Sequence, residues 1–205
     1  MQAKHTRKAL ALAALLAGGA AHATPVTELL INGSFEQNIQ ANGTWNVYNN
    51  LAGWTGGAYG IELRNNVAGV AADGVNFVEL DTTNNSSLSQ SVSTVLNKSY
   101  TLTFQFQDRP GVTTASQGLE ISWGGQVVGT VNNSLNGGWQ TVSYSLLGNG
   151  GMEALSFKAI GTNDSLGTSL DNISLTTAVP EPETYAMMLA GLGLVGFAAR
   201  RRKQK

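Results

Sequence analysis

The chain of 205 residues contains no cysteine, and its only two histidines, His5 and His22, lie near the N-terminus. Without cysteine there is neither a disulfide framework nor a thiolate metal site. If the N-terminal segment is removed, as argued below, the remaining chain cannot build a Ser-His-Asp triad, a Cys-His pair or the usual zinc site. Carboxylates remain, and these suit hard cations or acid–base chemistry on sugars.

Positive charge is scarce in the middle of the chain. Of the twelve lysines and arginines, three lie in the first eight positions and five in the last six. The segment 24–178 holds the other four, against eleven carboxylates, which gives it a net charge of −7. Those four cations are Arg64, Lys98, Arg109 and Lys158. Because a phosphate backbone repels such a segment, we expect no nucleic-acid partner.

The N-terminus has the three parts of a secretory signal peptide. A basic stretch (Lys4, Arg7, Lys8) precedes an apolar run over residues 9–20, and Ala21-His22-Ala23 is a small-x-small cleavage site. The apolar run is too short to span a bilayer, which needs about 20 residues. The sequence therefore predicts a signal peptide over residues 1–23, cleaved after Ala23 by signal peptidase.

The C-terminus also has three parts. Pro180-Glu181-Pro182 comes first, an uncharged and mostly apolar run follows over 184–199, and a basic cluster occupies 200–205. The basic end is expected to stay cytoplasmic, which leaves the preceding domain outside. In this order the parts, over 179–205, resemble the PEP-CTERM sorting signal of Gram-negative bacteria.

That resemblance implies a single hydrophobic transmembrane helix that anchors the chain in the inner membrane until an exosortase-type membrane protease acts on it. It further implies a cell-surface or extracellular-matrix location, associated with exopolysaccharide and biofilm. A permanent membrane anchor that is never cut is the alternative.

Between the two ends, residues 24–178 are predicted to form one all-β domain. Tyr100–Gln107 alternates apolar and polar residues, which is typical of a half-buried strand. Gly124-Gly125 has the length of a hairpin turn between two short strands, Leu119–Trp123 and Gln126–Val131. Further strands are expected at Leu29–Phe35, Gly60–Leu63, Phe77–Leu80, Ser87–Val95, Trp139–Leu147, Ala154–Ile160 and Leu170–Leu175. No helical stripe appears, so we expect an antiparallel sandwich of eight or nine strands.

Several segments, in order, carry a second resemblance. They are Leu30–Glu36, Gly53-Trp54, Phe77–Asp81, Ser89–Ser91 before Tyr100–Phe104, and Leu170–Leu175. This set is similar to galactose-binding-like jelly rolls, including DUF642-type domains and carbohydrate-binding modules. The resemblance implies a two-sheet jelly roll whose first and last strands meet, and a structural calcium held by Glu36 and Asp171. Alternatively, Glu36 ends a strand and Asp171 caps a turn.

Sugar binding uses an aromatic platform with a few polar groups beside it. Trp54 and Tyr59 lie in a Gly/Asn-rich stretch that is typical of loops, and Glu62 and Arg64 follow closely. We therefore name these four as candidate carbohydrate-binding residues. The other available aromatics are Trp45, Tyr48, Trp123 and Trp139. The alternative is that Trp54 and Trp139 close the ends of the core.

Catalysis is disfavoured, and no residue is predicted to be catalytic. A glycosidase needs two carboxylates across a cleft, and an acidic domain brings carboxylates together by chance. The available ones are Glu62, Glu79, Asp81, Asp108 and Glu120. The predicted function is an exported, non-catalytic surface or matrix protein that binds extracellular polysaccharide. The alternatives are a structural matrix component without a soluble ligand, or a glycoside-active enzyme.

Overall fold

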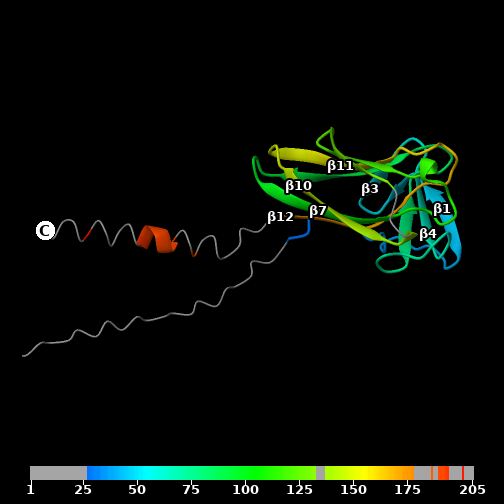
Figure 1. Ribbon diagram of the computed structural model, residues 1–205, viewed down its shortest axis with the longest axis horizontal. Coiled ribbons are helices and arrows are strands. Elements are labelled where there is room, and N and C mark those ends of the chain that lie inside the picture. Colours follow the sequence, from blue (N-terminus) through cyan, green and yellow to red (C-terminus); the bar gives the residue numbers. More distant parts are fainter. Residues whose placement is uncertain (1–26, 133–136, 178–185, 187–188, 194–199, 201–205) are drawn as a thin grey trace, which may run out of the picture. The chain divides into compact units, whose positions relative to one another are not determined.

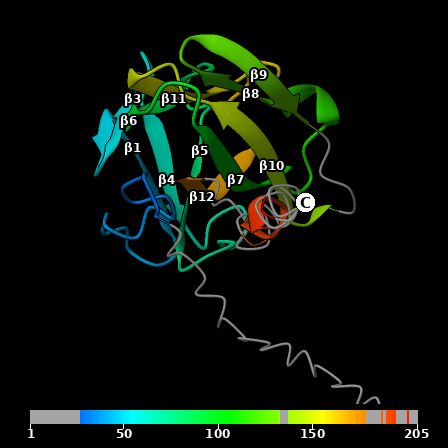
Figure 2. The same cartoon turned by 90° about the vertical axis from the view of Figure 1, so that its left-hand side faces the viewer.

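The computed structural model describes residues 27–132, 137–177, 186, 189–193 and 200. The chain divides into two units, and the larger, Val26–Val179, is a β-sandwich (Figure 1). Its strands form two six-stranded sheets in which every strand pair is antiparallel. Figure 2 shows the two sheets as facing layers. The predicted all-β sandwich is therefore confirmed.

Sheet A contains the last strand of the sandwich near its middle. Its order is β1-β4-β5-β12-β7-β10. The strands are β1 (Thr44–Tyr48), β4 (Ile61–Asn65), β5 (Asn76–Glu79), β12 (Ser169–Thr177), β7 (Ser99–Gln107) and β10 (Gln140–Leu147). Glu28 forms an antiparallel bridge with Thr176, so the start of the sandwich does meet its last strand.

Sheet B has the order β2-β3-β6-β11-β8-β9. Its strands are β2 (Asn50–Leu51), β3 (Trp54–Gly56), β6 (Ser87–Thr94), β11 (Gly151–Ala159), β8 (Leu119–Trp123) and β9 (Gln126–Val131). A short 3-10 helix, η1 (Thr114–Ser116), precedes β8.

The clearest sequence patterns form the predicted elements. β8 and β9 have the predicted bounds, and Trp123 pairs with Gln126 across Gly124-Gly125. Both glycines have positive φ, 55° and 80°, as a type I′ hairpin turn requires. In β7 the apolar positions are buried and the polar ones are partly exposed, because the strand presents one face to the core.

The predicted strand Leu29–Phe35 does not form beyond its contact with β12. The backbone turns at Asn32 and Phe35, whose φ angles are 58° and 61°, and the Phe35 N–H donates to the Asn32 carbonyl at 3.2 Å. The Phe35 ring is nevertheless fully buried and packs 6.0 Å from Trp54. The apolar pattern of this segment therefore comes from loop side chains that are buried in the core, and it does not indicate a strand.

The core lies between the sheets. Phe104 of β7 and Phe157 of β11 come from opposite sheets and meet edge to face, with ring centroids 5.0 Å apart. Both are fully buried. This contact joins the two layers between β7 of sheet A and β11 of sheet B.

The described residues of the tail, 186, 189–193 and 200, are helical. Among the residues that the structure describes, no helix has both the length and the apolar character needed to cross a bilayer. The hydrophobic helix expected in the tail stays a prediction, since most of its residues lie outside the described ranges.

Candidate functional site

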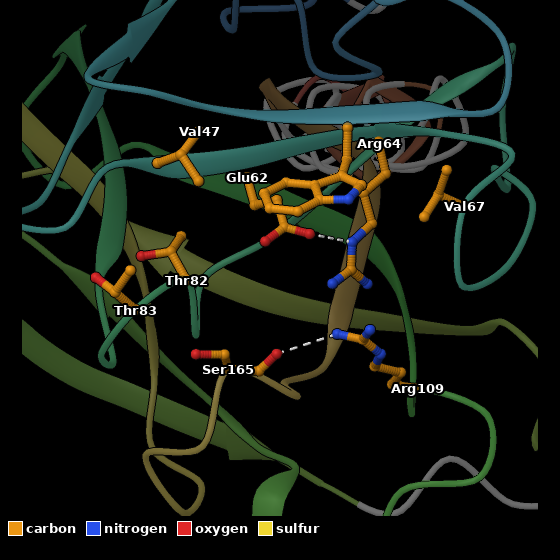
Figure 3. A pocket seen from close by; sticks show the side chains of 9 residues that line it. Val47, Glu62, Arg64, Val67, Thr82, Thr83, Arg109 and Ser165 are labelled. Carbon is orange, nitrogen blue, oxygen red and sulfur yellow. Dashed lines mark hydrogen bonds and ion pairs between the residues drawn. The ribbon is translucent and has the colours of Figure 1, made fainter.

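A cavity of about 370 Å³ opens on the outer face of sheet A, the face turned away from sheet B (Figure 3). Strands β1 and β4 supply its floor, and four loops supply its rim: the loops after β4, after β5 and after β7, and the loop before β12. The lining residues are Trp45, Val47, Glu62, Arg64, Val67, Thr82, Thr83, Arg109 and Ser165.

Strand alternation explains why charged groups face the cavity. Ile61 and Leu63 of β4 belong to the core, so Glu62 and Arg64 between and beside them point to the opposite face. β1 continues this face, because Trp45 lies opposite Arg64 in the strand register and Val47 opposite Glu62. Both charged side chains are nonetheless buried.

A network of ion pairs connects the charged groups. The Arg64 Nε donates to the Glu62 Oε1 at 2.6 Å, and the Arg64 Nη2 pairs with the Glu79 Oε2. The Arg109 Nη1 reaches the same Glu79 oxygen at 3.2 Å. The other oxygen of Glu79 accepts the Gly167 N–H at 2.6 Å. Two arginines and two glutamates thus hold each other in place, which is how a protein tolerates buried charge.

One donor in this network has no partner. Arg64 is only 1% exposed, yet its Nη1 makes no hydrogen bond within the described residues. Arg109 lies across the cavity from Arg64 and donates its Nη1 to the Ser165 carbonyl at 3.1 Å (Figure 3). Because an unmade hydrogen bond of a buried charged group is costly, Arg64 is prepared to receive an oxygen atom from a ligand.

Burial perturbs the carboxyl group beneath this arginine pair. Desolvation raises the pKa of Glu79 from 4.5 to about 7, even though Arg64, the Gly167 N–H and Arg109 all act to lower it. Glu79 has no exposed surface and is not among the residues that line the cavity. It therefore positions the two arginines from behind and does not meet a ligand.

The aromatic side chain at the cavity is Trp45. Its side chain is 55% exposed, which leaves indole surface free at the edge of a site lined by charged groups. No strand is predicted at Trp45 from the sequence, because Gly and Asn surround it. The usable signal was the alternation in Thr44–Tyr48, where Trp45 and Val47 share one face of β1.

The four predicted sugar-binding residues separate in the structure. Glu62 and Arg64 line the cavity, as expected for such a site. Trp54 is only 2% exposed and packs in the core, where its Nε1 donates to the Asn32 carbonyl at 3.0 Å. The prediction for Trp54 is thus corrected, because a buried ring has no face for a sugar. Tyr59 is exposed, and its carbonyl accepts the hydroxyl of Thr82, but it does not line the cavity.

Trp139 takes neither of the roles considered for it. It is half-buried, and its ring meets Phe77 edge to face at 6.0 Å. Phe77 is buried but lies outside the core cluster, and it shares a face of sheet A with Arg64, its register partner. The Trp139 Nε1 donates to the Val70 carbonyl at 3.0 Å. Trp139 therefore covers part of the outer face and does not close an end of the core.

Glu36 and Asp171, the predicted calcium ligands, both hold the loop that leads into β5. Glu36 Oε1 accepts the N–H groups of Val75 and Asn76 at 2.9 and 2.7 Å. Asp171 Oδ2 accepts the N–H groups of residues 72 and 73, at 2.8 and 2.9 Å. Within the described ranges, no group of three or more His, Cys, Asp or Glu is suited to a metal ion. The carboxylates thus fasten the loop from both sides, and calcium binding stays a prediction.

Asp171 is completely buried in this position. Burial raises its pKa from 3.8 to about 7, although backbone N–H groups that donate to the carboxylate act to lower it. Metal coordination favours the ionised form of such a group. Carboxylate oxygens are ligands that calcium accepts, so a bound calcium would keep Asp171 ionised in this buried position.

The catalytic alternative required two carboxylates facing one cleft. Glu62 and Glu79 are register partners on β4 and β5, but only Glu62 lines the cavity. Asp81 accepts two backbone N–H groups of the loop before β12, at 3.0 and 3.2 Å. Asp108 and Glu120 are not lining residues either. Among the described residues the cavity thus presents one carboxylate rather than a pair.

Comparison with known proteins assigns the tail. Residues 178–203 match the PEP-CTERM protein-sorting motif, so the predicted sorting signal is confirmed. The match includes Pro180, Glu181 and Pro182, which lie outside the described residues, as do Ala23 and the predicted signal peptide. The motif implies export, membrane-associated sorting and processing by an exosortase-type system.

Two solved structures show the fold of the sandwich. The Stig cyclase Fisc from Fischerella sp. TAU matches with a TM-score of 0.57 and 16% identity, over 77% of this chain and 100% of its own. TmCBM61, solved in complex with β-1,4-galactotriose, matches with a TM-score of 0.50 and 18% identity, over 74% of this chain and 99% of its own. At these identities the likeness concerns the fold alone, and the predicted two-sheet jelly roll is confirmed.

A curated relative is 30% identical over 161 residues, which is 78% of this chain. It is a multifunctional-autoprocessing repeats-in-toxin protein of Vibrio vulnificus. The chain spans 3% of the length of that relative.

Proposed function

We propose that this exported protein binds an extracellular polysaccharide in the cavity on the outer face of sheet A, and that it does not act on the polysaccharide chemically. The observation that carries the proposal is the buried Arg64, a residue of the cavity lining whose Nη1 lacks a partner among the described residues. A sugar hydroxyl offers the missing acceptor. The exposed ring of Trp45 supplies an apolar surface beside it, the usual combination in a sugar site.

The carboxylates support binding rather than hydrolysis. Glu79 has the raised pKa of a general acid, but its two oxygens are already engaged by Gly167 and the arginine pair. Glu62 accepts a hydrogen bond from Arg64. Since hydrolysis of a glycoside requires a proton donor and a second carboxylate at the sugar, we infer a binding protein. The galactotriose bound to TmCBM61 makes β-1,4-linked galactose a reasonable first ligand to test.

Location follows from the sorting motif. We propose that the signal peptide is cleaved after Ala23, that the tail holds the chain in the inner membrane for a time, and that processing delivers the domain to the cell surface or matrix of a Gram-negative bacterium. The intact mass of protein recovered from that surface tests both cleavages. A mass that includes residues 1–23 or the basic end would contradict this sequence of events.

Titration of the full chain with β-1,4-galactotriose and a panel of other oligosaccharides tests the binding itself. The buffer should contain calcium. Any detergent that keeps the full chain in solution should lack a sugar headgroup, because such a headgroup would compete with the oligosaccharides for the cavity. A tryptophan that a bound ligand covers contributes about 2 kcal/mol to binding, so Trp45→Ala should weaken binding by about 30-fold. Tyr59→Ala is the matched control, because this exposed aromatic lies outside the cavity lining and should leave affinity unchanged.

Two results would overturn the proposal. One is the absence of binding to every member of the panel by a chain whose circular dichroism shows a folded sandwich. The other is an affinity that Trp45→Ala leaves unchanged. Release of reducing sugar by the wild type, lost in Glu62→Gln, would instead establish the enzyme alternative.

A further inference from the structure

Two loops at one end of the sandwich form an apolar surface that the glycan site does not use. One loop joins β6 to β7 and the other joins β10 to β11. We propose that this surface, called the tip, rests on an anionic phospholipid bilayer while the sorting signal holds the chain at the membrane. The tip consists of residues 95–98 and 147–152.

The two loops are one surface because hydrogen bonds join them. The Asn97 N–H donates to the Gly148 carbonyl at 2.8 Å, and the Gly148 N–H donates to the Lys98 carbonyl at 2.9 Å. The Gly150 N–H donates to the Thr94 hydroxyl at 3.2 Å, at the point where β6 ends. The two loops therefore lie side by side at this end of the sandwich.

Four aliphatic side chains project from this surface. Val95, Leu96, Leu147 and Met152 are each between 54% and 70% exposed. Single exposed apolar residues are ordinary, but a group of them on adjoining loops marks a site of interaction.

The tip is held firmly rather than left to collapse onto the core. The Val95 N–H donates to the Tyr100 hydroxyl at 2.9 Å. The buried Glu153 accepts the Thr94 hydroxyl at 2.8 Å and the Asn149 N–H at 3.0 Å. These bonds fix both loops and also keep the charge of Glu153 inside. Because the loops are fixed, the four apolar side chains remain exposed to solvent.

The short connection between β12 and the sorting signal supports the bilayer as the surface that the tip contacts. Thr177, the last residue of β12, pairs with Tyr100, directly beside the first loop (Figure 1). Only residues 178–183 separate it from the uncharged run of the sorting signal that starts at Thr184. Six residues reach at most about 22 Å when fully extended. The sorting signal therefore cannot enter a membrane without bringing this end of the sandwich near the bilayer surface.

The charge of the tip matches a lipid surface as well. Lys98 is exposed within the first loop, and neither loop contains a carboxylate, although the domain as a whole is strongly acidic. A lysine beside aliphatic side chains is the composition that favours an interface with anionic phospholipid, since the amine meets phosphate and the aliphatic groups enter the acyl boundary.

Docking in this way leaves the glycan cavity accessible. β7 starts beside the tip at Ser99 and ends at Gln107, two residues before Arg109 of the cavity. A strand of nine residues spans about 30 Å. The cavity and the tip thus lie at opposite ends of β7, and the two proposals can fail independently of each other.

Single cysteines provide the test, because the chain has none of its own. Leu96→Cys and Met152→Cys place an environment-sensitive fluorophore on the tip. Ile160→Cys is the matched control, an exposed aliphatic position just after β11, at the end away from Met152. Each full-length variant is incorporated at one copy per lipid nanodisc of phosphatidylethanolamine and phosphatidylglycerol, with and without nitroxide-labelled acyl chains.

We expect the two tip labels to emit at shorter wavelength and to be quenched by the nitroxide, as for groups about 5–10 Å below the headgroups. The label at Ile160→Cys should show neither effect. Lys98→Glu in the same background should reduce the quenching, and discs of neutral lipid should reduce it too. Equal quenching at all three positions would overturn the proposal. A shift to shorter wavelength that occurs only at two or more copies per disc would also overturn the proposal, because the tip would then contact a second copy of the chain rather than lipid.

Discussion

Replacement of Glu79 by glutamine should change how the stability of the domain depends on pH. Glu79 is completely buried, and its pKa is raised from 4.5 to about 7 by desolvation against the attraction of Arg64. Below pH 4.5 the carboxyl group carries a proton in both the folded and the unfolded chain. As the pH rises toward 7, the unfolded chain releases this proton while the folded chain keeps it, so folding becomes less favourable.

The magnitude follows from the same two pKa values. Each pH unit between them removes about 1.4 kcal/mol from the free energy of unfolding, which amounts to about 3 kcal/mol in all. Above pH 7 the loss stops, because both states are then ionised. Glutamine cannot ionise, so Glu79→Gln should lack this part of the pH dependence, and its stability relative to wild type should improve by about 3 kcal/mol between pH 4.5 and 8.

Urea unfolding followed by tryptophan fluorescence, at pH values from 4.5 to 8, measures this difference directly. Other titrating groups cancel when the two proteins are compared at each pH. Glu120→Gln is the control for the loss of a carboxyl group elsewhere in the domain, since Glu120 is half-buried on β8 opposite Lys158. A wild type that gains stability over Glu79→Gln as the pH rises would refute the reasoning. It would mean that the arginines, rather than burial, decide the charge of Glu79.

Two further experiments test the contacts of the N-terminal segment with the rest of the sandwich. Gly33→Ala should destabilise the domain by about 1–3 kcal/mol in thermal or urea unfolding, because the new Cβ would overlap the Ile173 carbonyl. Gly138→Ala, which meets no atom within 4 Å, should be nearly neutral, and equal effects of both changes would contradict this packing. Calcium at millimolar concentration should raise the melting temperature of the wild type and not that of Glu36→Gln or Asp171→Asn. An unchanged melting temperature on chelation of the wild type would remove the predicted calcium site.

Strands with one face exposed to solvent and the other packed on the core can be predicted from the sequence. In Tyr100–Gln107 apolar and polar residues alternate because β7 packs one side on the core. The hairpin over Leu119–Val131 can be predicted because its two glycines allow the tight turn. The same argument fails for β1, where most residues are exposed, and for β3, which has three residues. Short strands with little buried surface owe their pairing to neighbours, so their own composition resembles that of loops.

The site is predictable only as far as it is local. Glu62 and Arg64 lie two residues apart on one strand, so their spacing alone places them on one face. Arg109 arrives from the far end of β7, and no pattern near it in the sequence indicates that it meets Glu79. The sequence predicts Trp54 at the sugar site, whereas Trp45 lines the cavity, and this difference has a similar cause. Trp54 packs in the core against Phe35, a loop residue whose turn was predicted as a strand.

The central place of β12 in sheet A affects the order of events during export. Sheet A lies incomplete, with β5 and β7 separated, until the chain as far as Thr177 is available to fold. The polypeptide therefore crosses the membrane before its sandwich can close, and such non-local pairing is slow. β12 ends at Thr177, directly before the sorting motif at residues 178–203, so the sandwich can close only once the chain up to that motif is available to it.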